Sequence, residues 1–169
     1  MVINLSRFLR YSLDNEPNSK VTLAQEIDTL KLYLDIEKVR FGDRLSFEIN
    51  ITETAYQALI PSLLLQPIIE NSMKHAIAKN EQGGCIFIVA NVTDNTLIIT
   101  LSDSGSGQDT TEASPQVNGS GGVGLKNIQA RLSALYSNKY KFYSTTNKTT
   151  LGVETTIEIP YETTQLGNI

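Results

Sequence analysis

Residues 63–77 read LLLQPIIENSMKHAI, and this stretch decides the fold that the sequence predicts. Wound into a helix at about 100° per residue, the stretch separates into an apolar side and a polar side. The apolar side comprises Leu65, Ile68, Ile69, Ser72 and Ala76 with Met73 at its edge, and the polar side comprises Glu70, Asn71, Lys74 and His75. We therefore expect a helix that packs one face into a core and presents an acid, an amide, a base and an imidazole on the other.

The polar side of this helix has the chemistry of a site for a metal ion and its phosphates. Mg²⁺ takes oxygen ligands, often one or two from the protein and the rest from substrate phosphates and water, so the Asn71 carbonyl and the Glu70 carboxylate suit it. Lys74 then offers a point charge to a phosphate. Charged groups on one helix face are also the ordinary solvated surface, so this helix alone leaves both interpretations open.

The composition argues against several classes of protein. A net charge of −4 and a pI near 5.0 disfavour nucleic-acid binding, which needs clustered Lys and Arg. Cys85 is the single cysteine, which excludes an internal disulfide framework and suits a reducing, cytoplasmic setting. With His75 as the single histidine, the chain also has too few ligands for an ordinary zinc site. No apolar run reaches about 18 residues and the N-terminus lacks signal-peptide order. We expect a soluble piece, whose parent protein can still carry a membrane anchor.

Helical patterns fill the first part of the chain. Residues 1–14 place apolar side chains at helical spacing, and NEPNS ends the pattern. A second helix starts at Thr22, with Gln25 three residues later as a capping box. Its apolar seam comprises Leu23, Ile27, Leu30, Leu34 and Phe41. We expect this seam to pack on another helix, from a bundle or from a partner subunit.

Alternating apolar residues predict strands in the rest of the chain, with Asp94 and Asn95 forming a hairpin turn. The expected strands are residues 45–51, 85–92, 97–103, 141–146 and 153–159. An amphipathic helix should begin just after Gly124, and the polar tail from Tyr161 should fray. This order predicts an α/β two-layer sandwich, a mixed sheet with helices on one face, preceded by a short helical segment.

Two glycine-rich stretches flank a segment without apolar anchors. DSGSG at 103–107 follows a strand, so Asp103 can accept a hydrogen bond from an adenine amino group while Gly105 and Gly107 let the backbone approach a ligand. Asp and Gly also make plain turns, so this motif is weak by itself. GGVGL at 121–125 leads into a helix, where Gly122 and Gly124 can expose amides to phosphates. The alternative is a flexible linker, and residues 108–122 should be mobile.

Neither glycine stretch matches the common phosphate-binding motifs, because no GK[ST] follows and G-x-G-x-x-G does not follow the first strand. Taken together and in order, however, ENSMKH, DSGSG and GGVGL closely resemble the ATP-binding domain of sensor histidine kinases. This domain belongs to the GHKL superfamily with the Bergerat fold, which also holds the gyrase and MutL ATPase domains. LAQEIDTLKLYLDIEKVRFGDRL upstream and TTIEIP near the end narrow the resemblance to the LytS-like class.

The resemblance implies a role for each matching residue. Asn71 would ligate Mg²⁺, Glu70 would assist the metal or polarise an accepting histidine, and Lys74 would act with them in phosphoryl transfer. The implied nucleotide contacts are Asn71, Lys74, His75, Asp103, Gly105, Gly107, Gly122, Val123, Gly124, Leu125 and Thr155. Ser104 and Ala76 depart from the family pattern, in which asparagine and glycine are common at these places. Neither departure removes a group that ATP binding needs.

The resemblance also implies a domain division and partners. Residues 1–41 would be the end of the dimerisation helices and a connecting helix, 42–162 the ATP-binding catalytic domain and 163–169 a tail. The phosphoacceptor histidine would lie upstream of this sequence, and the partners would be ATP, those helices in a homodimer and a response regulator. Three alternatives stay open: a nucleotide-binding module without kinase activity, an anti-sigma-type serine kinase or ATPase, and a helical interaction protein that needs no nucleotide.

Overall fold

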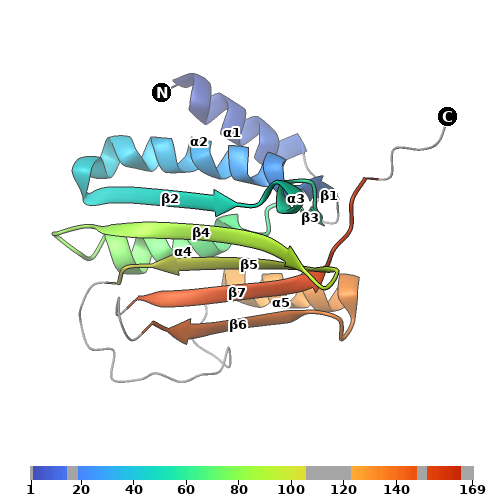
Figure 1. Ribbon diagram of the computed structural model, residues 1–169. Helices are drawn as coiled ribbons and strands as arrows, with labels where there is room; N and C mark the ends of the chain where they lie inside the picture. Colours follow the sequence, from blue (N-terminus) through green and yellow to red (C-terminus); the bar gives the residue numbers. More distant parts are fainter. Residues whose placement is uncertain (1, 15–18, 106–122, 148–151, 165–169) are drawn as a thin grey trace.

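The main sheet of the protein is mixed, as the sequence predicts. The computed structural model describes residues 2–14, 19–105, 123–147 and 152–164 (Figure 1). The strands are β2 (Leu45–Ile51), β4 (Gly84–Thr93), β5 (Thr96–Asp103), β7 (Val153–Pro160) and β6 (Lys141–Thr146), in this spatial order. β2 runs parallel to β4, and the remaining neighbours are antiparallel.

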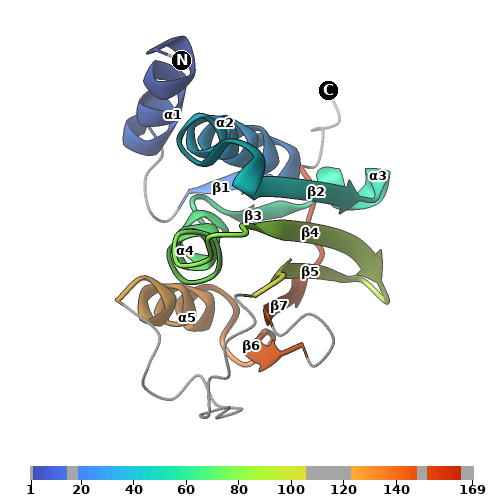
Figure 2. The same ribbon diagram turned by 90° about the vertical axis from the view of Figure 1, so that its left-hand side faces the viewer.

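Helices cover one face of this sheet. Figure 2 shows α2 (Leu23–Phe41), α4 (Gln66–Ser72) and α5 (Val123–Tyr136) on the same side of the strands, with α1 (Val2–Asp14) lying outside them against α2. The short helix α3 (Glu53–Tyr56) follows β2. The expected two-layer sandwich with a preceding helical segment is therefore confirmed. None of the described helices is both long and apolar enough to cross a membrane.

The strands form because their apolar side chains alternate. In β5, Leu97, Ile99 and Leu101 are buried against the helices, and the side chains between them are less buried. Asp94 and Asn95 join β4 to β5 with positive φ angles of 48° and 60°, which is the backbone of a two-residue hairpin turn. The predicted hairpin is thus confirmed. Asp103 is the next inward position after Leu101, so the strand itself aims this carboxylate toward the helical layer.

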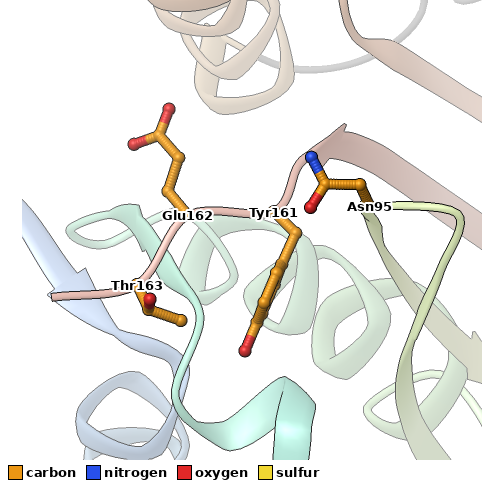
Figure 3. A pocket seen from close by; sticks show the side chains of 4 residues that line it. All are labelled: Asn95, Tyr161, Glu162 and Thr163. Atoms are coloured by element: carbon orange, nitrogen blue, oxygen red, sulfur yellow. The ribbon is translucent and has the colours of Figure 1, made fainter. Parts of the chain in front are cut away.

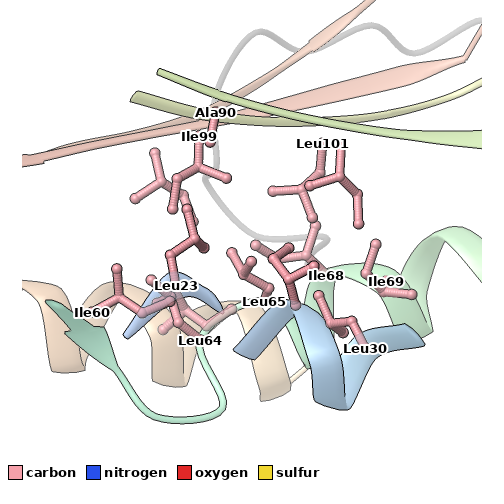
Figure 4. Packing of buried hydrophobic residues seen from close by; sticks show 14 of the residues in the cluster. Leu23, Leu30, Ile60, Leu64, Leu65, Ile68, Ile69, Ala90, Ile99 and Leu101 are labelled. Carbon is pink, nitrogen blue, oxygen red and sulfur yellow. The ribbon is translucent and has the colours of Figure 1, made fainter. Parts of the chain in front are cut away.

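The capping box that starts α2 is also present, because the Thr22 side chain accepts from the Gln25 amide and the Gln25 side chain accepts from the Thr22 amide. Leu23, Ile27, Leu30 and Leu34 of the seam are fully buried in the same cluster as α4 and the sheet (Figure 4). The expectation that the seam packs in a bundle or on a partner subunit was wrong. The protein's own core covers the seam. The domain boundary after residue 41 stays a prediction.

Two short features escaped the sequence patterns. β1 (Lys20–Thr22) pairs antiparallel with β3 (Leu59–Pro61), and three-residue strands are too short to show an alternation. The expected fraying from Tyr161 was wrong for the first tail residues. The Tyr161 amide donates to the Asn95 carbonyl at 2.9 Å, and the Leu59 amide donates to the Glu162 carbonyl at 2.7 Å. Residues 165–169 lie outside the described part of the chain.

Candidate functional site

The central helix is built in two parts. α4 covers Gln66–Ser72, and a π-helical turn, Met73–Ile77, continues it, with the Ala78 amide donating to the Met73 carbonyl at 2.9 Å. The helix starts later than the sequence suggested, because Leu63 has a φ of 56° and stands outside it. Pro67 occupies the first turn, where its missing amide hydrogen costs no hydrogen bond. π turns recur at functional sites, and this one holds Lys74 and His75.

The two sides of the helix are separated as predicted, except that Ser72, expected on the apolar side, is only half-buried. The buried residues are Ile68, Ile69, Met73, Ala76 and Ile77. Glu70, Lys74 and His75 are exposed and Asn71 is half-buried. The wide turn changes the spacing of the polar side, because its hydrogen bond spans five residues instead of four. The polar groups therefore remain together at the surface of the helical layer but do not follow an ideal α-helix.

Asp103 lies at the end of β5 and is 4% exposed. Its Oδ1 atom accepts from the Gly105 amide at 3.1 Å and from the Val153 amide at 3.1 Å. Amides from two chain segments therefore fix the orientation of this carboxylate. A buried and oriented carboxylate is a suitable acceptor for the exocyclic amino group of a base.

The loop after Asp103 is attached to its surroundings on two sides. The Ser104 amide donates to the Cys85 carbonyl at 3.0 Å, and the Ser104 hydroxyl accepts from the Cys85 amide at 2.9 Å. Asn80, just beyond the π turn, donates to the Gly105 carbonyl at 3.4 Å and to the Gly83 carbonyl at 2.7 Å. The end of the central helix is therefore tied to the first glycine motif.

The charges show that the π turn and Asp103 share one neighbourhood. Burial lowers the pKa of the His75 imidazole, the positive charges of Lys79 and Lys74 lower it further, and the carboxylate of Asp103 acts in the opposite direction. Electrostatic effects of this kind need charges that are close together. ENSMKH and DSGSG, far apart in the sequence, thus meet at one end of the sheet.

β7 provides the strand beside Asp103. Thr155 pairs with Leu101 in the β5–β7 register, is buried, and its hydroxyl lies 2.9 Å from the Ser144 hydroxyl. Since Leu101, Asp103 and Thr155 are all inward positions, Thr155 lies on the same face of the sheet as the carboxylate. This is the position at which a nucleotide contact by Thr155 was predicted.

The second glycine motif is described only in part. α5 begins at Val123, two residues earlier than expected, and a β-carbon added to Gly124 would lie 3.2 Å from the Pro67 Cβ atom. The start of α5 therefore packs closely on the first turn of α4, and Leu125 packs against the core. The predictions for Gly107, Gly122 and a mobile segment at 108–122 concern residues outside the described ranges.

Glu70 lies near α2. Its Oε1 atom accepts from the Gln66 side chain at 2.9 Å. Burial raises the pKa of the Tyr33 phenol of α2, and the negative charges of Glu37 and Glu70 raise it further. The polar side of the central helix thus extends from the vicinity of Asp103, at His75, to the vicinity of α2, at Glu70.

The oxygen donors of the central helix suit Mg²⁺ better than a metal that is held by protein groups alone. The described residues contain no group of three or more His, Cys, Asp or Glu side chains that could hold a metal ion. Asn71 is half-buried and Glu70 is exposed, so both oxygens can face a ligand from outside. This arrangement suits a cation that takes most of its ligands from phosphates and water, as Mg²⁺ does.

Comparison with known proteins shows which family this chain resembles. A family model described as histidine kinase matches residues 1–45. Sensor protein LytS of Staphylococcus haemolyticus is 30% identical over 169 residues, covering 96% of this chain and 29% of that protein. Sensor histidine kinase YpdA of Escherichia coli is 33% identical over 141 residues, covering 80% of this chain and 24% of that protein. These matches support a similarity to the ATP-binding domain of LytS-like sensor histidine kinases.

Solved structures confirm the fold of this LytS-like chain. The catalytic domain of histidine kinase ThkA superposes with a TM-score of 0.63 at 12% identity, covering 86% of this chain and 97% of that one. Histidine kinase AdeS of Acinetobacter baumannii superposes with a TM-score of 0.62 at 16% identity, covering 95% of this chain and 77% of that one. The chain has the fold of histidine kinase catalytic domains, and it spans about 29% of the length of the LytS relative above.

A hollow of about 480 Å³ lies elsewhere on this LytS-like chain and is lined by Asn95, Tyr161, Glu162 and Thr163 (Figure 3). Asn95 lies at the hairpin end of β5, whereas Asp103 lies at the opposite end of this strand. The hollow is therefore remote from the cluster of sequence motifs. It lies between the hairpin and the tail that is tied to it.

Two residues of the site were missed by the sequence analysis. Asn80 ties the helix to Gly105, and an asparagine directly after a helix and before a Gly-Gly turn is a signal that was available. Gly152 packs against Asp103 so closely that a β-carbon there would overlap the Asp103 carbonyl oxygen. A glycine that precedes a strand does not by itself indicate such a contact, so the sequence offered no signal for its role.

Proposed function

We propose that this chain is the ATP-binding catalytic part of a sensor histidine kinase. It would bind Mg·ATP and transfer the γ-phosphoryl group to a histidine outside this sequence, for relay to a response regulator. The observation that carries the proposal is the meeting of Asp103 with the π turn that holds His75, at one end of the sheet. The similarity to LytS-like sensor histidine kinases and the fold shared with histidine kinase catalytic domains support it further.

In this proposal each side chain has a defined task. Asp103, oriented by two amides, accepts from the adenine amino group, and Thr155 supports the base from the next strand. Asn71 and Glu70 hold Mg²⁺, which would neutralise phosphate charge. Lys74 and His75 approach the phosphates, and Gly124 with Val123 and Leu125 places the start of α5 beside α4. Positioning and charge neutralisation dominate the catalysis of phosphoryl transfer.

The partners and location follow from the same proposal. The accepting histidine belongs to dimerisation helices of the parent protein, and α1 suits the end of such a helix because Ile3 and Leu13 are 72% and 84% exposed. ATP and a response regulator place this part in the cytoplasm, with the parent protein anchored in the membrane. The parent would act as a homodimer.

The test is calorimetric titration of the chain with Mg·ATP analogues. Asp103→Asn keeps the shape of the side chain and removes the charge, and we expect it to weaken binding at least tenfold, about 1.4 kcal/mol. Asp94→Asn is the matched control, because Asp94 is an exposed hairpin residue whose positive φ asparagine tolerates. Equal affinity of the unmodified chain and Asp103→Asn would refute the assignment of the base-binding carboxylate. Acid-labile phosphate on the parent protein tests the transfer itself.

A further inference from the structure

A carboxylate of α2 reaches the start of the central helix. Glu26 is 1% exposed, and its two oxygens accept separately from backbone amides. Oε2 accepts from the Leu63 amide and Oε1 from the Leu65 amide, each at 3.1 Å. Leu65 is the N-cap residue of α4, and no side chain of its own segment caps that helix. Glu26 therefore supplies from another element the acceptor that a helix start requires.

Arg131 of α5 contacts the same segment before the central helix. Its guanidinium donates to the Ser62 carbonyl at 2.7 Å, directly before the segment that Glu26 holds. Burial lowers the pKa of Arg131, and the negative charge of Glu26 opposes this lowering, so the two groups are within electrostatic range. A buried carboxylate is stable in a protein when it is hydrogen-bonded and has an opposite charge nearby.

Residues 62–65 are thus held from two sides, by α2 and by α5. Leu63 has a φ of 56°, which is unfavourable for a leucine, so this segment needs contacts from its surroundings to keep its conformation. The α4 helix that follows carries Glu70 and Asn71 and leads into the π turn with His75. A displacement of α2 would therefore reach the start of the central helix through Glu26, in addition to the backbone bond from the Ser62 amide to the Ser19 carbonyl at 2.9 Å.

We propose that Glu26 is a positioning residue for the nucleotide site, which couples the placement of α2 to that of α4 and α5. The inference rests on the proposed function and extends it to the regulation of the same site. Residues 1–45, which include α1 and α2, match the histidine kinase family model. A signal that moves α2 relative to the sheet would then change nucleotide affinity through Glu26.

The test compares Glu26→Gln with Asp28→Asn in the present chain. Both variants change an acid to its amide in α2, but Asp28 is exposed. We expect Glu26→Gln to weaken Mg·ADP binding about fivefold or more, the lower end of typical coupling between sites. Asp28→Asn should change it less than about twofold. Amide hydrogen exchange should quicken at residues 63–72 in Glu26→Gln and not in the β4–β5 hairpin, which a merely global loss of stability would not produce.

The outcomes separate this inference from the proposed function. If Glu26→Gln melts at a lower temperature but binds Mg·ADP like Asp28→Asn, Glu26 is only structural and the inference is overturned. If the unmodified chain binds no nucleotide, the proposed function fails, while the exchange experiment still decides whether Glu26 holds α4. If Glu26→Gln does not fold, Glu26→Asp replaces it, because the side chain that is one methylene shorter keeps the charge near Arg131 but cannot reach both the Leu63 and the Leu65 amides. Unchanged affinity and exchange in a folded Glu26→Asp would then overturn the inference.

Discussion

Gly152 and Asp103 pack so closely that a β-carbon at residue 152 would overlap the Asp103 carbonyl oxygen and lie 2.7 Å from its Oδ1 atom. The contact involves backbone, which cannot move aside as the end of a flexible side chain can. Because the next amide, that of Val153, donates to the same Oδ1 atom, the close approach also positions the carboxylate.

Gly152→Ala should therefore disturb the strand end and the site together. We expect a loss of about 1–3 kcal/mol in the free energy of unfolding, the usual cost of forcing atoms into a packed region. Urea unfolding measures it. Gly124→Ala is the comparison, because its β-carbon would meet only the Pro67 side chain, at 3.2 Å. A smaller loss in Gly152→Ala than in Gly124→Ala would show that the contact with Asp103 is not rigid.

The titration of His75 tests whether the π turn and Asp103 lie together. His75 is the only histidine, so NMR reports its pKa without ambiguity. Asp103→Asn removes a charge that raises this pKa and should lower it further, whereas Lys79→Gln removes a charge that lowers it and should raise it. Asp94→Asn should leave it unchanged. If the pKa of His75 is identical in the Asp103→Asn and Asp94→Asn variants, His75 does not lie near the Asp103 carboxylate.

The lowered pKa of His75 predicts that the stability of the protein depends on pH. The folded state disfavours the charged imidazole, so this contribution to stability is present above the ordinary pKa of 6.5 and is lost as the pH falls through the lower folded value. His75→Gln should remove this part of the dependence. Urea midpoints between neutral and mildly acidic pH measure it, and a steeper decline in the variant would contradict the sign.

Asn71 should determine how strongly nucleotide binding depends on Mg²⁺. Asn71→Ala removes the amide oxygen, so we expect the affinities measured with and without Mg²⁺ to become nearly equal, while they differ at least about tenfold in the unmodified chain. Asn91→Ala, at an exposed position of β4, is the control. If Asn71→Ala keeps the full magnesium dependence, the cation is held by other groups.

The capping box of α2 should contribute measurably to stability. Thr22→Ala removes the side-chain acceptor of the Gln25 amide, and we expect a loss of about 1 kcal/mol. Gln25→Ala leaves the Thr22 acceptor in place and should cost less. Thermal and urea unfolding of the two variants give the order of the effects. Equal stability of Thr22→Ala and the unmodified chain would show that the capping box does not stabilise the protein.

Local patterns predicted most of the fold. The alternation in β5, the Asp94–Asn95 turn and the Thr22 capping box each depend on residues within a few positions, so their sequence signals are direct. The seam of α2 was correctly expected to be buried, but its spacing could not say whether a partner helix or the protein's own sheet covers it. Tertiary packing decided in favour of the core.

The site was predictable only as separate motifs. Nothing in ENSMKH indicates a π turn, because the apolar spacing suits an α-helix equally well. Glu26 looked like an ordinary charged residue of a helix, and only the fold brings it to the Leu63 and Leu65 amides, 37 and 39 positions away. The roles assigned to the motif residues stay predictions until nucleotide binding is measured.

The attachment of Tyr161 and Glu162 has a practical consequence for labelling. Tyr161 is held beside Asn95, and β5, with eight residues rising about 3.3 Å each, separates Asn95 from the Asp103 end by roughly 26 Å. A fluorophore or surface tether introduced at the exposed Thr163 would therefore sit far from the proposed nucleotide site. Such a probe can report on the sheet in binding experiments without blocking the Asp103 end.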